Sequence, residues 1–243
     1  QTRRATHIIS ATEGMYHYAK EKYATVIENF YVKPAGVDLK LFDLSCNKRA
    51  EVMSMLGLKP EHIVCVYAGK FGGIYLEQEV FDFFSVAERF WGQRFRVVLL
   101  TNASPFQIDQ NSRKAGLHPD TVISRFVPHH QVPVFMGVAD FAITPVKPVP
   151  SKRYCTPIKN GEYWALGLPV VIPANISDDA SIIEKHNIGA ILYELNDAAY
   201  EHAICKIDAL IGTPDIRDTI RKVADHYRNF SHAEDIYTKL YAH

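Results

Sequence analysis

A lysine and a glutamate stand three residues apart in the stretch YCTPIKNGEYWALGLPVV, Tyr154 to Val171, just before an apolar run. A helix that begins near Lys159 leaves unpaired amides in its first turn, where the lysine charge opposes the helix dipole. A bound anion would compensate that charge. Glu162, one turn further on, has the reach of a carboxylate that holds hydroxyl groups. The alternative is a weak surface ion pair between residues i and i+3.

A second candidate site is the loop YAGKFGG, Tyr67 to Gly73, which follows a predicted strand and precedes a helix. Its glycines, Gly69, Gly72 and Gly73, let the backbone approach an anion closely, and Lys70 adds a positive charge. A phosphate group fits this combination. The loop matches neither the dinucleotide fingerprint nor a Walker motif, and it fits equally well a turn that only closes a tight strand-to-helix connection.

Composition and charge exclude several classes of protein. The 243 residues contain 27 Lys and Arg against 27 Asp and Glu, so no net field attracts nucleic acid or an acidic membrane. The four cysteines lack the spacing of a zinc site or a disulfide framework and are typical of a reducing cytoplasm. No apolar run approaches the roughly 20 residues of a membrane span, and no signal-peptide pattern is seen. Because the opening reads like the middle of a domain, we expect a fragment.

The candidate loops must be positioned by the elements around them. From about His62 short apolar runs alternate with longer amphipathic runs, which predicts an α/β fold with a parallel sheet. The short runs are continuously apolar, which predicts burial on both faces, with helices on either side. Six strands are predicted, at residues 62–67, 95–100, 121–126, 140–144, 168–172 and 188–193.

Helices are predicted between these strands. One has a core-facing stripe at helical spacing, made of Val80, Phe84, Ala87 and Trp91. Another begins with Ser104 as N-cap and Pro105 in its first turn, and it ends before Gly116. A short helix is predicted at residues 178–186, and the chain is predicted to be mainly helical from residue 197 onward. A short strand, a helix and an extended segment are predicted in the first fifth of the chain.

Smaller signals favour modest roles. His129 and His130 have no thiol or carboxylate nearby in the sequence and are predicted to be surface residues, not metal ligands. Asp178 and Asp179 are predicted to cap a helix N-terminus. Cys155 lies beside the candidate phosphate site, so a lowered pKa of its thiol is one hypothesis.

The segment GEYWALGLPVVI resembles the Glu-Ala-Met-Ala-Cys-Gly-Leu-Pro-Val-Val signature of retaining glycosyltransferases with the GT-B fold, glycosyltransferase family 4. In the same order, YAGKFGG resembles the family's Gly-Arg loop, FVPHHQVPVFMGVADFAITP its base-side loop, helix and strand, and DDASIIEKHNIGAIL its closing strand-helix unit. The segments HIISATEGMYHYAKEKY and VKPAGVDLKLFD resemble the end of the family's first domain and the interdomain connector. NFSHAEDIYTKLY resembles the last helix, which crosses back. The resemblance covers nearly the whole chain.

The resemblance implies a domain organisation. In such enzymes two Rossmann-like domains face a cleft, the first holding the acceptor and the second the sugar nucleotide. Residues 1–45 would then be a remnant of the acceptor-binding domain with the interdomain connector. Residues 46–230 would form the donor-binding domain, a Rossmann-like parallel sheet with helices on both faces. Residues 231–243 would form the C-terminal crossover helix.

The resemblance also assigns roles to residues. Lys70 would replace the arginine that meets the donor diphosphate, Lys159 would lie beside the phosphates, and Glu162 would hold the ribose. These three are the catalytic candidates. The donor-binding candidates are Gly69, Gly72, Gly73, the backbone near Thr156, Pro157 and Ile158, the base-bordering loop Arg125, Phe126 and Val127, and Tyr154.

Two positions depart from the family pattern. Tyr154 stands where the family usually has a second glutamate, which touches the transferred sugar, and Ile74 follows the glycine loop where a lysine is usual. No Asp-x-Asp motif is present, in agreement with a fold that neutralises the leaving phosphate with protein cations. We therefore expect neither a metal nor another cofactor.

The resemblance thus implies retaining transfer of a sugar from a nucleotide-sugar donor, a UDP- or GDP-sugar, to an acceptor such as a glycan or a lipid-linked sugar. A cytoplasmic location, a polysaccharide pathway and peripheral membrane association through the missing domain are compatible with it. We expect the fragment alone to turn over poorly.

Three alternatives stay open at this point. A sugar-nucleotide 2-epimerase shares the GT-B fold, and a non-catalytic nucleotide-sugar-binding module would account for Tyr154 and Ile74. An NAD-dependent oxidoreductase is less favoured, because the second predicted strand ends at Thr101 and Asn102 without a carboxylate for a ribose hydroxyl.

Overall fold

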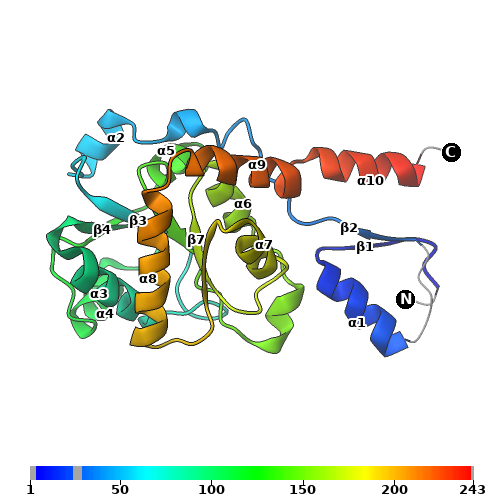
Figure 1. The fold of residues 1–243 in the computed structure, drawn as a ribbon, viewed down its shortest axis with the longest axis horizontal. Coiled ribbons are helices and arrows are strands. Elements are labelled where there is room, and N and C mark those ends of the chain that lie inside the picture. Colours follow the sequence, from blue (N-terminus) through cyan, green and yellow to red (C-terminus); the bar gives the residue numbers. More distant parts are fainter. Residues whose placement is uncertain (1–3, 24–28, 242–243) are drawn as a thin grey trace.

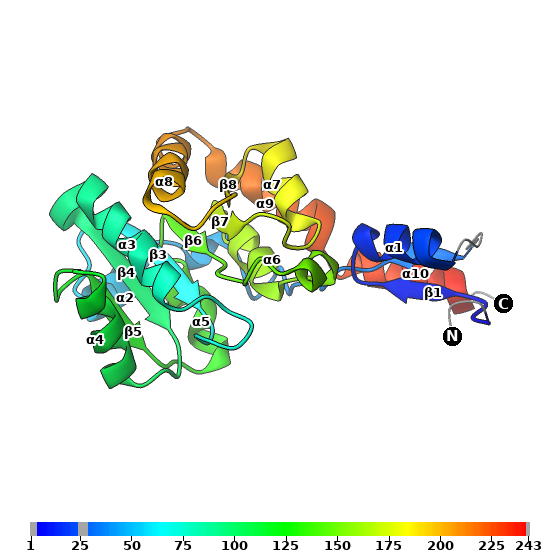
Figure 2. The same ribbon diagram turned by 90° about the horizontal axis from the view of Figure 1, so that it is seen from below.

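The computed structural model describes residues 4–23 and 29–241, which form two parts of unequal size (Figure 1). The larger part is an α/β domain built on a six-stranded sheet. We name the smaller part the small lobe; it consists of β1 (Ile8–Ser10), α1 (Glu13–Tyr23), β2 (Phe30–Val32) and α10 (Ser231–Tyr241). Figure 2 shows the small lobe at one end of the molecule, away from the sheet. The strand and helix predicted in the first fifth are confirmed, while residues 24–28 lie outside the described residues.

The sheet of the α/β domain is parallel, in the order β5-β4-β3-β6-β7-β8. Its strands are β3 (Ile63–Ala68), β4 (Phe95–Leu100), β5 (Val122–Arg125), β6 (Phe141–Ile143), β7 (Val170–Pro173) and β8 (Gly189–Leu192). All six predicted strands are therefore present, with ends shifted by at most two residues.

Helices cover both faces of this sheet, as predicted. One face carries α3 (Gln78–Trp91), α4 (Pro105–Lys114) and α8 (Asp197–Ile211). The other carries α2 (Ala50–Met55), α5 (Val132–Met136), α6 (Ile158–Ala165), α7 (Asp179–His186) and α9 (Ile216–Arg228). In β3, Val64 and Val66 belong to one core cluster and Cys65 and Tyr67 to the other, because successive side chains of a strand point to opposite faces.

Short 3₁₀ turns lie between these elements, at Leu44–Cys46, Gly92–Arg94, His129–Gln131 and Pro150–Tyr154. The predicted start of α4 is confirmed, since Ser104 Oγ accepts a hydrogen bond from the Gln107 amide at 3.2 Å. The stripe predicted on α3 is also confirmed as core, and Trp91 stacks on Phe95 with ring centroids 5.6 Å apart. The Trp91 indole N–H donates to Asp208 Oδ1 at 2.8 Å, which satisfies its polar atom at the edge of the core.

The chain passes between the small lobe and the α/β domain twice, before and after the domain, and the two crossings are bonded to each other. The Val37 amide donates to the Arg228 carbonyl at 2.8 Å, and Val37 pairs with Asn229 as an isolated bridge. Val37 and Phe42 also pack into the domain core. The boundary predicted at residue 45 stays a prediction.

Gly161 on α6 leaves room for this junction. A Cβ atom there would lie 2.6 Å from Val37 Cγ2 and 3.1 Å from Arg228 Cγ. The connector and the end of α9 thus press directly on α6, a contact that only a residue without a side chain allows.

A cluster of charged and polar groups lies at the edge of the sheet where the strands begin. Lys48 Nζ lies 2.8 Å from Asp140, which also accepts the Val64 amide at 2.8 Å. Burial lowers the pKa of Lys48, although the Asp140 carboxylate opposes the shift. Beside this cluster His62 is buried, and its Nδ1 accepts the Lys59 amide at 3.1 Å. Burial, followed by the nearby Arg96 charge, lowers the pKa of His62.

Acidification should therefore destabilise the fold through His62. Because its folded pKa is lowered, the neutral ring stabilises the fold above the unfolded value of about 6.5, and this contribution is lost as the pH falls through the lower folded pKa. We expect His62→Asn, whose side-chain oxygen can still accept the Lys59 amide, to show a smaller drop in unfolding free energy between about pH 7.5 and 5.5. Urea denaturation at both pH values measures the unfolding free energy of each protein. Equal drops in the wild-type protein and in His62→Asn would contradict the role of His62.

Gly161→Ala should destabilise the protein although alanine is the better helix former. The new methyl meets Val37 and Arg228, and such overpacking costs about 1–3 kcal/mol, more than the roughly 1 kcal/mol gained in helix propensity. Gly212→Ala is the matched control, because its Cβ would meet only ordinary contacts, the nearest at 3.7 Å. Thermal unfolding of both variants compares them, and an unchanged or raised Tm for Gly161→Ala would show that the junction is loose.

Candidate functional site

The candidate loops leave the sheet where its strand order reverses. The chain runs outward from β3 to β4 and β5, then returns to the other side of β3 with β6. In open α/β sheets, ligands bind beyond the carboxyl ends of the strands at such a switch point. The loops that follow β3 and β6 are joined there, since the Leu76 amide donates to the Pro145 carbonyl at 2.7 Å and the Lys147 amide to the Ile74 carbonyl at 3.0 Å.

The loop after β3 is shaped partly by its own strand. A Cβ at Gly69 would lie 2.6 Å from the Tyr67 hydroxyl, which itself donates to the Lys70 carbonyl. Gly69 therefore has a packing reason to be glycine. Gly72 and Gly73 have positive φ angles of 74° and 61°, which favour glycine, and the Lys70 side chain is exposed beside them.

The start of α6 carries the Lys159–Glu162 pair, with Lys159 in the first turn and Glu162 one turn further on. Lys159 Nζ lies 2.6 Å from Glu162 Oε2, so the i, i+3 pairing that the sequence left open is present. The pair is not an ordinary surface pair, because only 5% of the Glu162 side chain is exposed, against 33% for Lys159. Pro157 precedes the helix, and no side chain among residues 4–23 and 29–241 caps it by a hydrogen bond. The amides of the first turn therefore have no side-chain acceptor among these residues, and they lie beside the half-buried Lys159.

A hydrogen bond ties this helix to the end of β3. The Ala68 amide donates to the Tyr163 hydroxyl at 2.9 Å, one residue beyond Glu162 and two residues before Lys70. Burial raises the pKa of Tyr163 well above its ordinary value, so the hydroxyl stays neutral. The structure therefore brings Lys159 and Glu162 into contact and holds the glycine loop at the same edge of the sheet.

The other predicted site residues are more scattered. Arg125 and Phe126 are exposed at the carboxyl end of β5, two strands from β3, and Phe126 is 80% exposed. Val127 packs against the core, and Ile158 is exposed at the start of α6. The Tyr154 ring packs on Tyr18 of α1 at 5.4 Å between centroids, so it contacts the small lobe.

Thr156 belongs to a buried polar network that the sequence did not reveal. The Arg228 guanidinium donates to the Thr156 hydroxyl and to the Asp179 carboxylate, and both side chains of the ion pair are 1% exposed. Asp179 also accepts the Asn160 amide group at 2.6 Å, and Asn160 Oδ1 accepts the Thr144 hydroxyl. Burial raises the pKa of Asp179, while Arg228 opposes the shift.

The predicted capping role of Asp178 and Asp179 is wrong. Asp179 forms an ion pair with Arg228, and Asp178 Oδ2 accepts the Glu13 amide at 2.8 Å across the interface with the small lobe. Neither side chain caps α7. Asp178 instead places a negative charge at the N-terminus of α1, where the helix dipole favours it.

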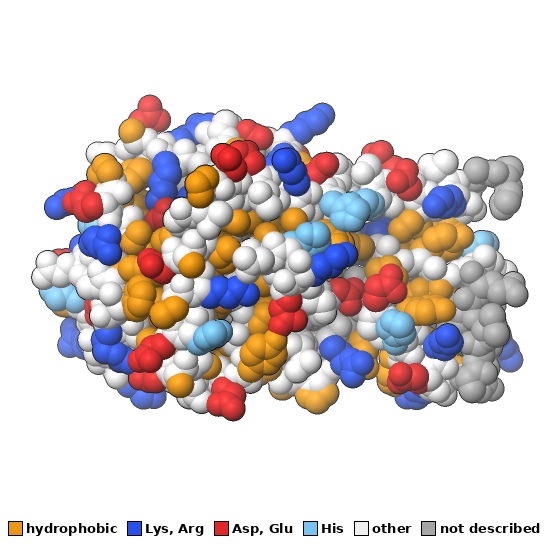
Figure 3. Space-filling view, in the orientation of Figure 1, with side chains coloured by type: hydrophobic (Ala, Val, Ile, Leu, Met, Phe, Trp, Pro, Cys, Tyr) orange, Lys and Arg blue, Asp and Glu red, His pale blue; other side chains and the backbone are white. Residues whose placement is uncertain are grey.

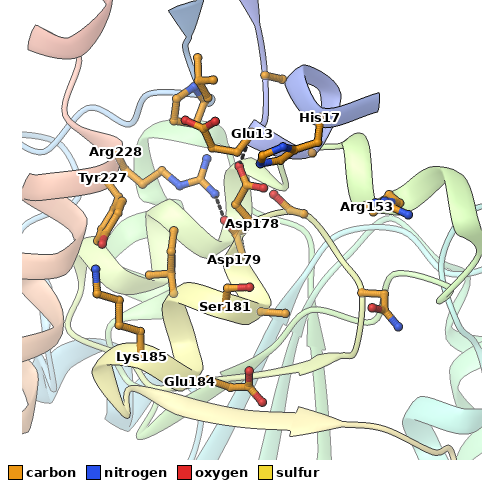
Figure 4. A pocket seen from close by; sticks show the side chains of 18 of the residues that line it. Glu13, His17, Arg153, Asp178, Asp179, Ser181, Glu184, Lys185, Tyr227 and Arg228 are labelled. Carbon is orange, nitrogen blue, oxygen red and sulfur yellow. Dashed lines mark hydrogen bonds and ion pairs between the residues drawn. The ribbon is translucent and has the colours of Figure 1, made fainter. Parts of the chain in front are cut away.

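A cavity of about 1190 Å³ lies between the small lobe and the α/β domain (Figure 4). Its walls include Glu13, His17, Arg153, Asp178 and Lys185, which come from α1, the 3₁₀ turn Pro150–Tyr154, and α7 with the residue before it. The space-filling view shows acidic, basic and histidine side chains together at this junction (Figure 3). None of the predicted site residues lines this cavity. The cavity is thus separate from the loops singled out in the sequence.

The lowered pKa considered for Cys155 is also wrong. Burial raises the pKa of its thiol, which donates to the Lys152 carbonyl at 3.0 Å. His129 and His130 are exposed, as predicted. Within the described ranges, no group of three or more His, Cys, Asp and Glu side chains could hold a metal ion. No helix in the part of the chain that the structure describes is long and apolar enough to span a membrane.

Sequence comparison gives a partial match. A family model described as "Glucosyltransferase 3-like, C-terminal domain" matches residues 149–209, a stretch that contains α6 and α7. A search of curated proteins found no match.

Structure comparison covers nearly the whole chain. HepE of Anabaena, solved in complex with UDP, aligns with a TM-score of 0.75 at 16% identity, over 100% of this chain and 65% of that one. Sucrose-phosphate synthase of Thermosynechococcus elongatus gives 0.72 at 17% identity, over 99% and 60%. The pneumococcal O-GlcNAc transferase GtfA, in complex with UDP and GlcNAc, gives 0.71 at 12% identity, over 98% and 45%.

The chain thus spans less than two thirds of the length of these structures. At such low identity the likeness concerns the fold. It confirms the α/β fold class, a parallel sheet flanked by helices, and the chain shares this fold with the GT-B glycosyltransferases.

Proposed function

We propose that the protein transfers a sugar from a nucleotide-sugar donor to an acceptor with retention of configuration, and that the first turn of α6 and the loop after β3 hold the donor. The observation that carries this proposal is the Lys159–Glu162 pair, in which the glutamate is nearly buried, at a helix start without a side-chain cap and at the switch point of the sheet. The matched family model includes this turn, and two of the similar structures contain UDP.

The chemistry of the two residues fits a nucleoside diphosphate. An ammonium group has three N–H donors, so Lys159 can keep one on Glu162 and offer the others to phosphate oxygens. Glu162 has two carboxylate oxygens and can accept ribose hydroxyls with the one that Lys159 leaves free. The amides of Ile158 and Lys159 add donors, and the helix dipole favours the negative charge. Lys70 extends a second cation from the loop after β3.

In this proposal the reaction needs little from the protein beyond positioning and charge. As the bond between the sugar and the β-phosphate breaks, negative charge grows on the departing diphosphate. Lys70, Lys159 and the α6 amides would stabilise that charge from fixed positions, and such preorganised stabilisation is usually the largest single contribution to catalysis. Phe126, exposed beyond β5, would offer an aromatic face to the base. The acceptor would be a glycan or a lipid-linked sugar.

Calorimetric titration with UDP and with uridine tests the phosphate site. We expect the protein to bind UDP more tightly than uridine, and Lys159→Met to weaken UDP binding about tenfold or more while leaving uridine binding unchanged, because only the diphosphate contacts the lysine. Lys185→Met is the matched control, since Lys185 lines the separate cavity. A folded protein that binds neither UDP nor GDP, nor their sugars, would refute the proposed function.

A second titration tests Glu162 with 2′,3′-dideoxy-UDP. The protein should prefer UDP over this analogue about tenfold or more, because a buried carboxylate loses its hydroxyl partners when the analogue binds. Glu162→Gln should reduce the preference, and its melting temperature reports whether the helix is intact. An unchanged preference in this variant would mean that the ribose lies elsewhere.

A further inference from the structure

Arg228 occupies the point where three distant segments meet. Its carbonyl accepts the Val37 amide at 2.8 Å, and its side chain donates to the Ala35 carbonyl at 3.3 Å. Both bonds hold the connector that leads from the small lobe into the α/β domain. The same guanidinium reaches α7 through Asp179 and the segment before α6 through Thr156 (Figure 4 shows the bond to Asp179).

These contacts converge on the start of α6 from several directions. The Thr156 hydroxyl accepts both Arg228 and the Ala35 amide, the latter at 3.2 Å. Asn160, in the first turn, donates to the Asp179 carboxylate at 2.6 Å. The Arg228 guanidinium also lies 5.6 Å from the centroid of the Trp164 ring, one turn further along α6. The two residues before the helix and its first two turns are thereby fixed relative to the connector.

A buried ion pair of this kind is poor evidence of a role in stability. The desolvation of two charges offsets most of their attraction, and apolar replacements of such pairs are often neutral or stabilising. What the pair supplies is geometry, because the planar guanidinium forms hydrogen bonds in fixed directions. One of its polar atoms, Nε, is buried and has no hydrogen-bond partner among the described residues. The network therefore holds α6 in a defined position, although one donor of Arg228 is left without a partner among the described residues.

We propose that Arg228 is a positioning residue for the donor diphosphate: acting through Thr156 and Asp179, it holds the first turn of α6 in the orientation that binds phosphate. This inference rests on the proposed function of that turn. Arg228 itself is 2% exposed and does not touch the ligand. Its hydrogen-bond partners lie next to Ile158 and Lys159, so we expect the effect to fall mainly on the phosphate-binding amides and Lys159.

The chain offers a matched control on the same helix. Arg221 on α9 donates to the carbonyls of Leu39 and Ala165 at 2.8 and 2.7 Å, so it also joins the connector to α6, but at the opposite end of that helix. Arg228→Lys and Arg221→Lys are the same substitution. Thr156→Val is a milder variant, which removes one acceptor and keeps the ion pair.

The experiment is calorimetric titration of the unmodified protein and these variants with UDP and with uridine, together with their melting temperatures. Arg228→Lys and Thr156→Val should weaken UDP binding about fivefold or more and leave uridine binding unchanged. Arg221→Lys should lower the melting temperature without changing either affinity. A purely structural role of Arg228 predicts instead that both arginine variants lower the melting temperature and bind UDP as the unmodified protein does.

The outcomes separate this inference from the proposed function. If Thr156→Val and Arg228→Lys both fold and bind UDP as tightly as the unmodified protein, the positioning role is refuted and the proposed donor site is unaffected. If Arg228→Lys does not fold, Thr156→Val alone decides. If the unmodified protein binds neither UDP nor GDP, the donor site and the positioning role fail together.

Discussion

The buried Arg228–Asp179 ion pair is the interaction on which the arrangement of the molecule most depends. Each side chain is 1% exposed, so neither charge can be left alone without a large desolvation cost. Asp179 begins α7, and Arg228 ends α9 at the second crossing to the small lobe. The pair thereby fixes the two helices, the connector and the start of α6 around one point, next to the turn that carries Lys159 and Glu162.

Much of the fold could be predicted from the sequence because its signals are local. Most of the six strands are mainly apolar, and Ser104 with Pro105 marks the start of α4 by residue type alone. The Arg228–Asp179 pair had no such signal. Its partners are 49 residues apart, and another bond of the guanidinium spans 72 residues to Thr156, so only the folded chain brings them together. The cavity between the small lobe and the α/β domain was missed for the same reason.

Errors arose where a side chain had a distant partner that outweighed its local preference. Asp178 has the residue type of a helix cap, yet it accepts an amide from α1 across the interface. Cys155 lies near a lysine and an arginine, but burial outweighs their charges and raises its pKa. For the candidate site, the spacing of Lys159 and Glu162 allowed an i, i+3 pair near the start of a helix, and the structure contains that pair, while the near-complete burial of Glu162 was not visible in the sequence.

The contact between Lys159 and Glu162 also bears on how fast a charged molecule would reach this turn. With no ligand present, the two opposite charges largely cancel at distances beyond a few ångströms, and the chain as a whole carries equal numbers of acidic and basic residues. Long-range attraction, which accelerates encounters at low ionic strength, is then weak. Encounter with an anion should depend mainly on diffusion and orientation, and its rate should change little when salt is added.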